Sequence, residues 1–232
     1  MSGPPVSRPW HQRWFYVVAR CACRVLATLF FRYRAVGREH IPTEGGALVC
    51  SNHQSYFDPI AVGIAFRRRL NYLARASLFR SRFFGWLIRY LDAIPIERDG
   101  MGLSGLKETM RRLRRSEMVL IFPEGTRTAD GRMQPLKPGF LVVAHRCGVP
   151  LLPVGVDGAY QAWPRDAKWP RLTRVVTVIG PPIAPEELQT LSDEEAIELL
   201  SQRIGACLEE AQRLRGGARG RAFKPPRDGP TA

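Results

Sequence analysis

The chain has 232 residues, of which 45% are hydrophobic, and its 35 Lys and Arg outnumber its 21 Asp and Glu, giving a net charge of +14. This apolar content excludes wholesale disorder, and a chain of this length can bury a core as one domain. The charge admits nucleic acid, an anionic membrane or a phosphorylated small molecule as a partner. The five cysteines are scattered and odd in number, which argues against a disulfide framework and a zinc site.

The positive charge is concentrated in three stretches. Residues 1–40 carry a net +6, the acid-free stretch between Asp58 and Asp92 carries +7, and residues 213–232 carry +5. The remainder of the chain is therefore net −4. The basic character belongs to particular segments and is not spread evenly along the chain.

We interpret residues 1–36 as a loose lead-in followed by a basic amphipathic helix over 10–33. Arg13, Arg20 and Arg24 recur at helical spacing, and Trp and Val side chains can share another face. These charges leave no uncharged apolar run of roughly 18 residues, so we expect neither a conventional membrane-spanning helix nor a signal peptide. The helix can lie in a membrane interface or pack on the protein's own core, and its broad aromatic face favours the interface.

Beyond residue 36, short apolar runs alternate with helical patterns. The expected strands are 47–50, 71–74, 93–96, 118–122, 151–156 and 174–179. The expected helices are 58–66, 78–90, 103–115, 139–147 and 193–214. The last helix begins after a capping box made by Ser192 and Glu195. This alternation predicts an α/β domain over 37–215, with a mostly parallel sheet flanked by helices. Residues 216–232, rich in Gly, Arg and Pro, are expected to be disordered.

The first candidate catalytic residues directly follow the first strand of this domain. In the block from Asn52 to Asp58, which reads NHQSYFD, a histidine is followed five residues later by an aspartate. The carboxylate can accept from one ring nitrogen of His53 and leave the other nitrogen free to take a proton. The spacing alone is a weak signal, since His53 can equally be structural and Asp58 can cap the following helix.

A second candidate site follows the strand 118–122, in the hexapeptide from Phe122 to Arg127, which reads FPEGTR. Gly125 lets the backbone approach a ligand closely, and Thr126 and Arg127 supply donors for an oxyanion. Loops at strand ends of open α/β sheets are the usual place for ligands. The alternative is an ordinary turn in which Arg127 is solvated and Glu124 is paired with it.

Together the two blocks resemble the glycerolipid acyltransferase family, and within it the bacterial 1-acylglycerol-3-phosphate acyltransferases. Four ordered family blocks have counterparts at residues 52–58, 93–98, 122–127 and 149–154. The third block matches residue for residue, and Lys137-Pro138-Gly139 also fits. The second block departs from the family by having Ala93 where Gly is common and Pro95 where Phe is common. The resemblance extends from about residue 37 to residue 179.

The resemblance implies transfer of a fatty acyl group from a thioester to the free hydroxyl of 1-acylglycerol 3-phosphate, giving phosphatidic acid. His53 would act as the general base, and Asp58 would orient it. It also implies a site for the acceptor phosphate, formed by Arg98, Glu124, Gly125, Thr126 and Arg127. Glu124 would position the acceptor or an arginine, and Asn52 and Lys137 are further candidates for substrate binding. We expect no bound cofactor and no metal, with acyl-CoA or an acyl carrier protein as the co-substrate.

The nearest alternative keeps this chemistry and changes the acceptor to glycerol 3-phosphate or a lyso-aminolipid. A hydrolase with a Ser or Cys nucleophile would need an elbow such as Gly-x-Ser-x-Gly, which the sequence lacks. A nucleic-acid-binding protein is a remote alternative, because no recognised binding motif accompanies the charge. We expect a peripheral or monotopic enzyme on the cytoplasmic face of the cell membrane, where basic segments such as Arg67-Arg68-Arg69 meet anionic phospholipid.

Overall fold

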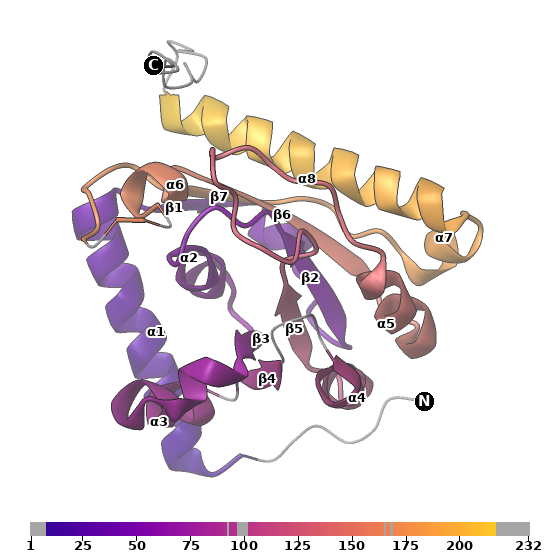
Figure 1. Ribbon diagram of the computed structural model, residues 1–232, viewed down its shortest axis with the longest axis horizontal. Helices are drawn as coiled ribbons and strands as arrows, with labels where there is room; N and C mark the ends of the chain where they lie inside the picture. The colour runs from indigo at the N-terminus through magenta and orange to yellow at the C-terminus, as the bar shows by residue number, and fades with distance from the viewer. Residues whose placement is uncertain (1–7, 92, 97–101, 165, 168, 217–232) are drawn as a thin grey trace, which may run out of the picture.

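The computed structural model describes residues 8–91, 93–96, 102–164, 166–167 and 169–216. Within these ranges seven strands form one sheet in the order β1-β7-β6-β2-β5-β3-β4 (Figure 1). Neighbouring strands are parallel except β6 and β7, so the prediction of a mostly parallel sheet is confirmed. The strands are β1 Arg34–Val36, β2 Ala47–Ser51, β3 Leu70–Arg75, β4 Ile94–Ile96, β5 Met118–Ile121, β6 Leu151–Asp157 and β7 Val176–Ile179.

The helices of the described residues connect these strands and cover the sheet. The α-helices are α1 Trp10–Phe31, α2 Asp58–Ala65, α3 Arg82–Tyr90, α4 Gly102–Arg114, α5 Gly139–Cys147, α6 Ala159–Ala162, α7 Pro185–Gln189 and α8 Asp193–Gly216. Two short 3-10 helices are η1 Arg38–His40 and η2 Ala76–Arg80. The predicted capping box is confirmed, because Ser192 and Glu195 exchange hydrogen bonds between side chain and backbone at 2.8 and 3.2 Å.

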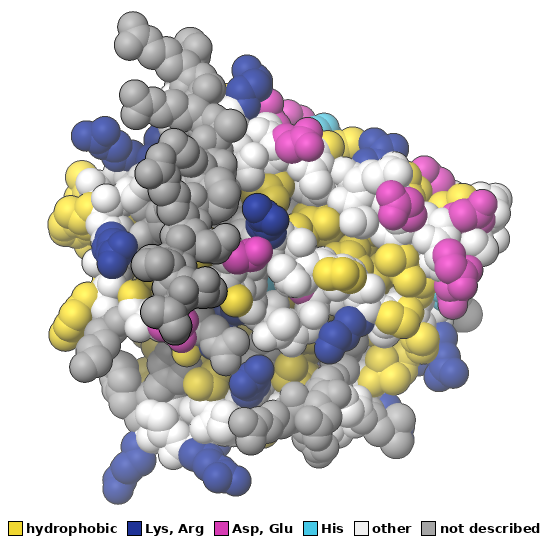
Figure 2. All heavy atoms as spheres, turned by 45° about the horizontal axis from the view of Figure 1, so that its top comes forward, with side chains coloured by type: hydrophobic (Ala, Val, Ile, Leu, Met, Phe, Trp, Pro, Cys, Tyr) yellow, Lys and Arg dark blue, Asp and Glu magenta, His cyan; other side chains and the backbone are white. Residues whose placement is uncertain are grey.

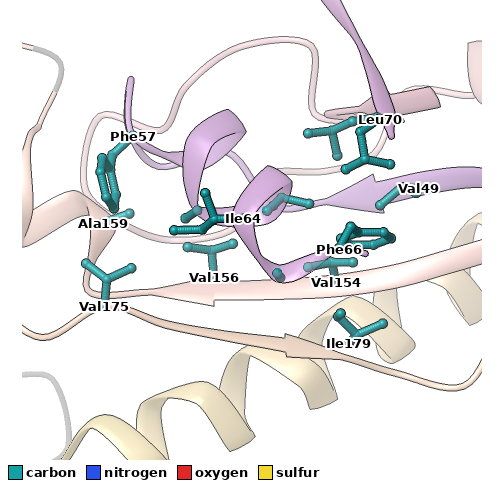
Figure 3. Close-up of a cluster of buried hydrophobic side chains, with 14 of the residues drawn as sticks. Val49, Phe57, Ile64, Phe66, Leu70, Val154, Val156, Ala159, Val175 and Ile179 are labelled. Carbon is teal, nitrogen blue, oxygen red and sulfur yellow. The ribbon is translucent and has the colours of Figure 1, made fainter. Parts of the chain in front are cut away.

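The central strands are buried on both faces. Val49 of β2 joins one hydrophobic cluster with α2, whereas its neighbours Leu48 and Cys50 join another with α4, α5 and α8. Figure 3 shows the first cluster, in which Ile64 and Phe66 lie among side chains of β2, β6 and β7. Because helices cover both faces, these strands are continuous apolar runs, which is why they could be predicted from sequence.

Helix α1 contacts the α2 side of the domain through a narrow strip (Figure 1). Its buried residues are Tyr16 and Ala27. Arg20 donates from Nη1 to the carbonyl of Phe66 at the end of α2. Trp10 and Leu29, on the predicted apolar face, remain 78% and 70% exposed. The apolar face of the helix is therefore not the face that packs on the core.

By length and composition, α1 is also long and apolar enough to cross a membrane. The sequence prediction concerned an uncharged apolar run of that length, which α1 lacks because it contains Arg13, Arg20 and Arg24, so the absence of a conventional span stays a prediction. One helix of this kind near the N-terminus does not by itself separate a membrane span from an interfacial helix.

The helix predicted over 78–90 is divided in two. Chain direction changes at Ser81, so that η2 is followed by α3, which folds back onto it. A Cβ at Gly85 would lie 2.5 Å from the carbonyl oxygen of Phe79, so the glycine permits this close contact. The apolar residues on both sides of Arg80-Ser81-Arg82 led to the prediction of one helix, and the break falls at this polar triplet.

Two elements of the structure lie at the limits of the predicted domain. Strand β1 falls inside the segment 1–36 and pairs with β7, so the sheet extends back to Arg34. At the other end α8 includes Gly216, the first residue of the tail predicted over 216–232, and the rest of that tail lies outside the described residues.

Two of the three consecutive arginines after α2 make structural contacts instead of facing solvent freely. Arg68 donates to four backbone carbonyls, those of Pro42, Glu44, Gly45 and Ser116. Arg69 donates to the carbonyl of Tyr90, and its guanidinium lies 4.5 Å from the ring centroid of Tyr16. The expectation that the whole triplet meets lipid headgroups is therefore not supported, and Arg67 is the exposed member.

Candidate active site

The two candidate blocks meet at one edge of the sheet. Strands β2 and β5 are parallel neighbours, with Cys50 opposite Ile121, so both end at the same edge. The loop 52–57 follows β2 and the hexapeptide 122–127 follows β5. Thr128 donates its backbone N–H to the carbonyl of His53 at 2.9 Å, which joins the two loops directly.

His53 and Asp58 form a hydrogen-bonded pair. Nδ1 of His53 lies 2.9 Å from Oδ2 of Asp58, a carboxylate with no exposed surface. The same oxygen accepts the N–H groups of Gln54 and Ser55, each at 2.6 Å. An acceptor-only carboxylate requires Nδ1 to carry a proton, so in the neutral imidazole Nε2 of His53 is the nitrogen that can accept one.

Asp58 was also a candidate cap for the following helix, and that alternative is wrong. It is the first residue of α2, but no side chain caps this helix end. The carboxylate instead holds the turn that precedes it, which carries His53. The structure therefore places Asp58 as the partner of the histidine and of its loop.

The imidazole of His53 is held on one face by Phe122. The two rings are stacked, with centroids 3.8 Å apart and an angle of 14° between planes. The side chain of His53 remains 18% exposed. An apolar ring against one face restricts rotation of the imidazole without competing for its protons.

Glu124 makes different contacts from those predicted. Oε1 accepts the backbone N–H of His53 at 2.7 Å, and Oε2 accepts that of Gln134 at 2.9 Å. The residue is only 2% exposed. Burial raises the pKa of Glu124 to about 7, opposed by the N–H donors of Gln134 and His53. Its carboxylate thus bridges loops instead of pairing with Arg127.

The cationic residues of the site lie beside this bridge. The guanidinium carbon of Arg127 lies 3.5 Å from the ring centroid of Tyr56, a residue of the His53 loop. Gly125 has φ of +74°, and a Cβ there would lie 3.1 Å from Nζ of Lys137, so the lysine covers this turn. Thr126 is exposed. Gly125, Thr126 and Arg127 belong to the hexapeptide, and Lys137 is joined to it by a hydrogen bond from its backbone N–H to the carbonyl of Pro123.

Asn52 is turned into the sheet. Its side-chain nitrogen donates to the carbonyl of Val156 at 2.9 Å, and its oxygen accepts the N–H of the same residue at 2.8 Å. Asn52 is 1% exposed, and both ends of its amide are engaged. These contacts give it a structural explanation that needs no substrate. Arg98, the remaining predicted phosphate ligand, lies outside the described residues.

Some contacts of the site had no signal in the sequence. Thr128 and Gln134 contribute backbone N–H groups, which any residue carries. Tyr56 belongs to the block 52–58, but its contact with Arg127 depends on how two loops that are distant in sequence meet. Among the described residues, no group of three or more His, Cys, Asp or Glu side chains could hold a metal ion.

Comparison with known proteins agrees with this geometry. A family model described as Acyltransferase matches residues 32–157. The chain belongs to this acyltransferase family. The match includes both loops of the site, so the resemblance based on their sequences is confirmed.

Two bacterial relatives of this acyltransferase share one name. The 1-acyl-sn-glycerol-3-phosphate acyltransferase of Pseudomonas aeruginosa is 33% identical over 87% of this chain and 79% of its own length. The protein of the same name from Bacillus subtilis is 25% identical over 82% of this chain and 94% of its own length.

A solved structure supports the fold of the acyltransferase. The crystal structure of PlsC, the 1-acyl-sn-glycerophosphate acyltransferase of Thermotoga maritima, superposes with a TM-score of 0.77 at 26% identity. The alignment covers 94% of this chain and 86% of that one. The shared fold therefore includes the sheet edge that carries His53 and Asp58.

Proposed function

We propose that this protein transfers a fatty acyl group from an acyl thioester to the free hydroxyl of 1-acylglycerol 3-phosphate, which gives phosphatidic acid for phospholipid synthesis. The observation that carries the proposal is the His53–Asp58 pair, joined through Thr128 to the loop of Arg127. A base and a cation on adjacent loops suit an acceptor that has both a hydroxyl and a phosphate. The names of the relatives specify this acceptor.

His53 acts as the general base of the reaction. Nε2 takes the proton of the acceptor hydroxyl as its oxygen attacks the thioester carbonyl, and Asp58 stabilises the imidazolium that forms. The tetrahedral intermediate then expels the thiolate, which receives the proton from Nε2. One C–O bond forms, one C–S bond breaks, and His53 returns to its initial state. No enzyme nucleophile is required.

The acceptor phosphate binds beside this base. Arg127 supplies planar N–H donors, Lys137 a mobile positive charge, and Thr126 a hydroxyl, while Gly125 leaves the space in which the Lys137 side chain lies over the turn. Arg98 remains a further predicted ligand from the sequence. We assign Glu124 to holding the loop of His53 and not to the phosphate, because two backbone N–H groups occupy its oxygens.

The donor is an acyl thioester, and we propose acyl-CoA or an acylated carrier protein. A thioester is already activated for attack by a hydroxyl, so the transfer has no redox step that would call for a bound cofactor.

We further propose that α1 holds the enzyme on the cytoplasmic face of the membrane as an interfacial helix. Its exposed side chains include Trp10, Trp14 and Leu29, with Arg13 and Arg24 also exposed. Aromatic and basic residues on one helix suit the boundary between lipid headgroups and acyl chains. A lipid acceptor and its product would then enter and leave without crossing water.

The distribution of acidic residues supports this orientation. Figure 2 shows acidic side chains gathered at one end of the molecule. The first turns of α7 and α8 lie at this end and contribute Glu186, Glu187, Asp193, Glu194 and Glu195. Figure 1 shows α1 on the opposite side of the domain. The acidic first turns of α7 and α8 therefore lie away from α1 and do not oppose its attraction to anionic lipid.

The decisive experiment is acyl transfer by the purified full-length protein to a panel of acceptors. Radiolabelled acyl-CoA and an acylated carrier protein would each be offered with 1-acylglycerol 3-phosphate, glycerol 3-phosphate or a lyso-aminolipid in mixed micelles. We expect labelled phosphatidic acid to be the main product. Preferential labelling of another acceptor, or no transfer from either thioester, would contradict the proposal.

A further inference from the structure

We infer that Tyr56 is a positioning residue that holds Arg127 in place for the phosphate of the acceptor. This inference rests on the proposed function and extends it to a residue between the catalytic histidine and aspartate. Tyr56 would act on the substrate only through the arginine.

The contact between the two side chains is close. The guanidinium carbon of Arg127 lies 3.5 Å from the ring centroid of Tyr56, which is the distance of direct stacking. Nη1 of Arg127 is buried and makes no hydrogen bond with any described residue. The aromatic face thus orients the guanidinium without using its N–H groups as hydrogen-bond donors, so phosphate oxygens do not have to displace a protein acceptor from them.

The ring of Tyr56 lies on a segment that hydrogen bonds of the preceding residue, Ser55, hold in place. Ser55 donates its hydroxyl to the carbonyl of Trp163 at 2.6 Å and accepts the N–H of Phe57 at 3.0 Å. The ring of Trp163 lies 5.9 Å from that of Tyr56 at an angle of 53°. Tyr56 is 51% exposed, so one side of its ring supports Arg127 while the site stays open.

This arrangement relates the phosphate site to the base within one short turn. Tyr56 follows His53 by three residues, and Asp58 fixes the backbone of that turn through Gln54 and Ser55. Stacking on Tyr56 therefore fixes the position of Arg127 relative to His53, although the arginine belongs to another loop. We infer that Tyr56 helps set the spacing between the bound phosphate and the hydroxyl that reacts.

The test compares Tyr56→Leu with Tyr56→Phe in the full-length protein. The leucine removes the aromatic face, and the phenylalanine retains it. With 1-acylglycerol 3-phosphate as acceptor, we expect Tyr56→Leu to raise KM by about tenfold with a smaller effect on kcat. Tyr56→Phe should keep KM within about twofold of wild type, since the ring face is what attracts the cation. Equal KM values for the two variants would overturn the inference.

A double-mutant cycle shows whether Tyr56 works through Arg127. In an Arg127→Ala background, Tyr56→Leu should cause no further rise in KM, because its partner is already absent. Effects that multiply in the double variant would overturn the inference. Thermal unfolding of each variant separates a local effect from loss of the fold.

A second acceptor separates this inference from the proposed function. 1-Acylglycerol has the same hydroxyl and acyl chain but no phosphate, so wild type and Tyr56→Leu should use it equally poorly. A selective loss with this acceptor would show that Tyr56 acts elsewhere. Failure of the wild type to acylate 1-acylglycerol 3-phosphate would instead reject the proposed function itself.

Discussion

The carboxylate of Glu124 accepts the backbone N–H of His53 at 2.7 Å, so a residue that follows β5 holds the main chain of a residue that follows β2. The other carboxylate oxygen accepts the N–H of Gln134. Glu124 therefore fixes the backbone of His53, while Asp58 fixes its imidazole ring. This role differs from the phosphate contact that the sequence suggested.

Replacing Glu124 by Gln should impair catalysis although the side chain keeps its size. A glutamine has one acceptor oxygen, so its NH₂ group would face one of the two N–H donors. Loss of a charged hydrogen bond costs about 1.5–3 kcal/mol, and we expect kcat to fall by about 10- to 100-fold. Glu194→Gln, an exposed change in the first turn of α8, is the matched control. Wild-type kcat in Glu124→Gln would refute the positioning role.

Glu124 should also make stability depend on pH in a definite direction. Its pKa is about 7 in the folded protein, against an ordinary value of 4.5. Between these values the folded state keeps a proton that the unfolded chain has lost, so the free energy of unfolding falls as pH rises. This contribution amounts to at most about 3 kcal/mol and is absent from Glu124→Gln. The stability advantage of wild type over the variant should therefore be larger at about pH 5 than at about pH 8.

Urea unfolding at the two pH values measures this difference. The comparison with Glu124→Gln cancels the titration of other groups that both proteins share. An advantage that stays constant, or increases with pH, would contradict the raised pKa.

His53→Ala should abolish acyl transfer while leaving the domain folded. The side chain is partly exposed, and its hydrogen bond to Asp58 is its main polar contact, so little of the core depends on it. A positioned general base contributes about 10²- to 10⁴-fold in rate, and we expect a loss of this size. His145→Ala, an exposed histidine on α5, is the control. A folded His53→Ala variant with wild-type turnover would exclude His53 as the base.

The sequence predicted the sheet better than the contacts of the site. Segments such as Met118–Ile121 are buried on both faces, so composition alone marks them as strands. Ser81, by contrast, separates η2 from α3, and although the polar triplet Arg80-Ser81-Arg82 marks this position, the packing of α3 back on η2 is a tertiary contact that it does not specify. Short elements such as β1 and α7 were missed, since a few residues give no periodicity to detect.

Within the site, residue types were predictable and their partners were not. The spacing of His53 and Asp58 suggested their pairing, because both belong to one short loop. Asn52 and Val156 are 104 residues apart in sequence, and their double hydrogen bond depends on β6 lying beside β2. The same holds for Tyr56 and Arg127. Contacts between loops follow from strand order, which the sequence alone did not provide.

The final prediction concerns membrane binding by the exposed face of α1. Changing Trp10, Trp14 and Leu29 to Ser should weaken binding to anionic vesicles by well over tenfold, since burying one large apolar side chain contributes about 1.5–3 kcal/mol. The fold should persist, because these side chains are 78%, 66% and 70% exposed. Val142→Ser, an exposed apolar change on α5, is the control. Cosedimentation with liposomes measures binding, and circular dichroism verifies folding.

The charges of α1 separate an interfacial helix from a membrane span. Arg13 and Arg24 are exposed, and each basic residue near an anionic surface contributes about 1 kcal/mol. Arg13→Gln with Arg24→Gln should therefore reduce binding to anionic vesicles by about 30-fold and leave weak binding to neutral vesicles unchanged. High salt should release the wild-type protein in the same way. Membrane association that resists both salt and the loss of these charges would instead indicate that α1 crosses the bilayer, because a buried span is held by apolar burial alone.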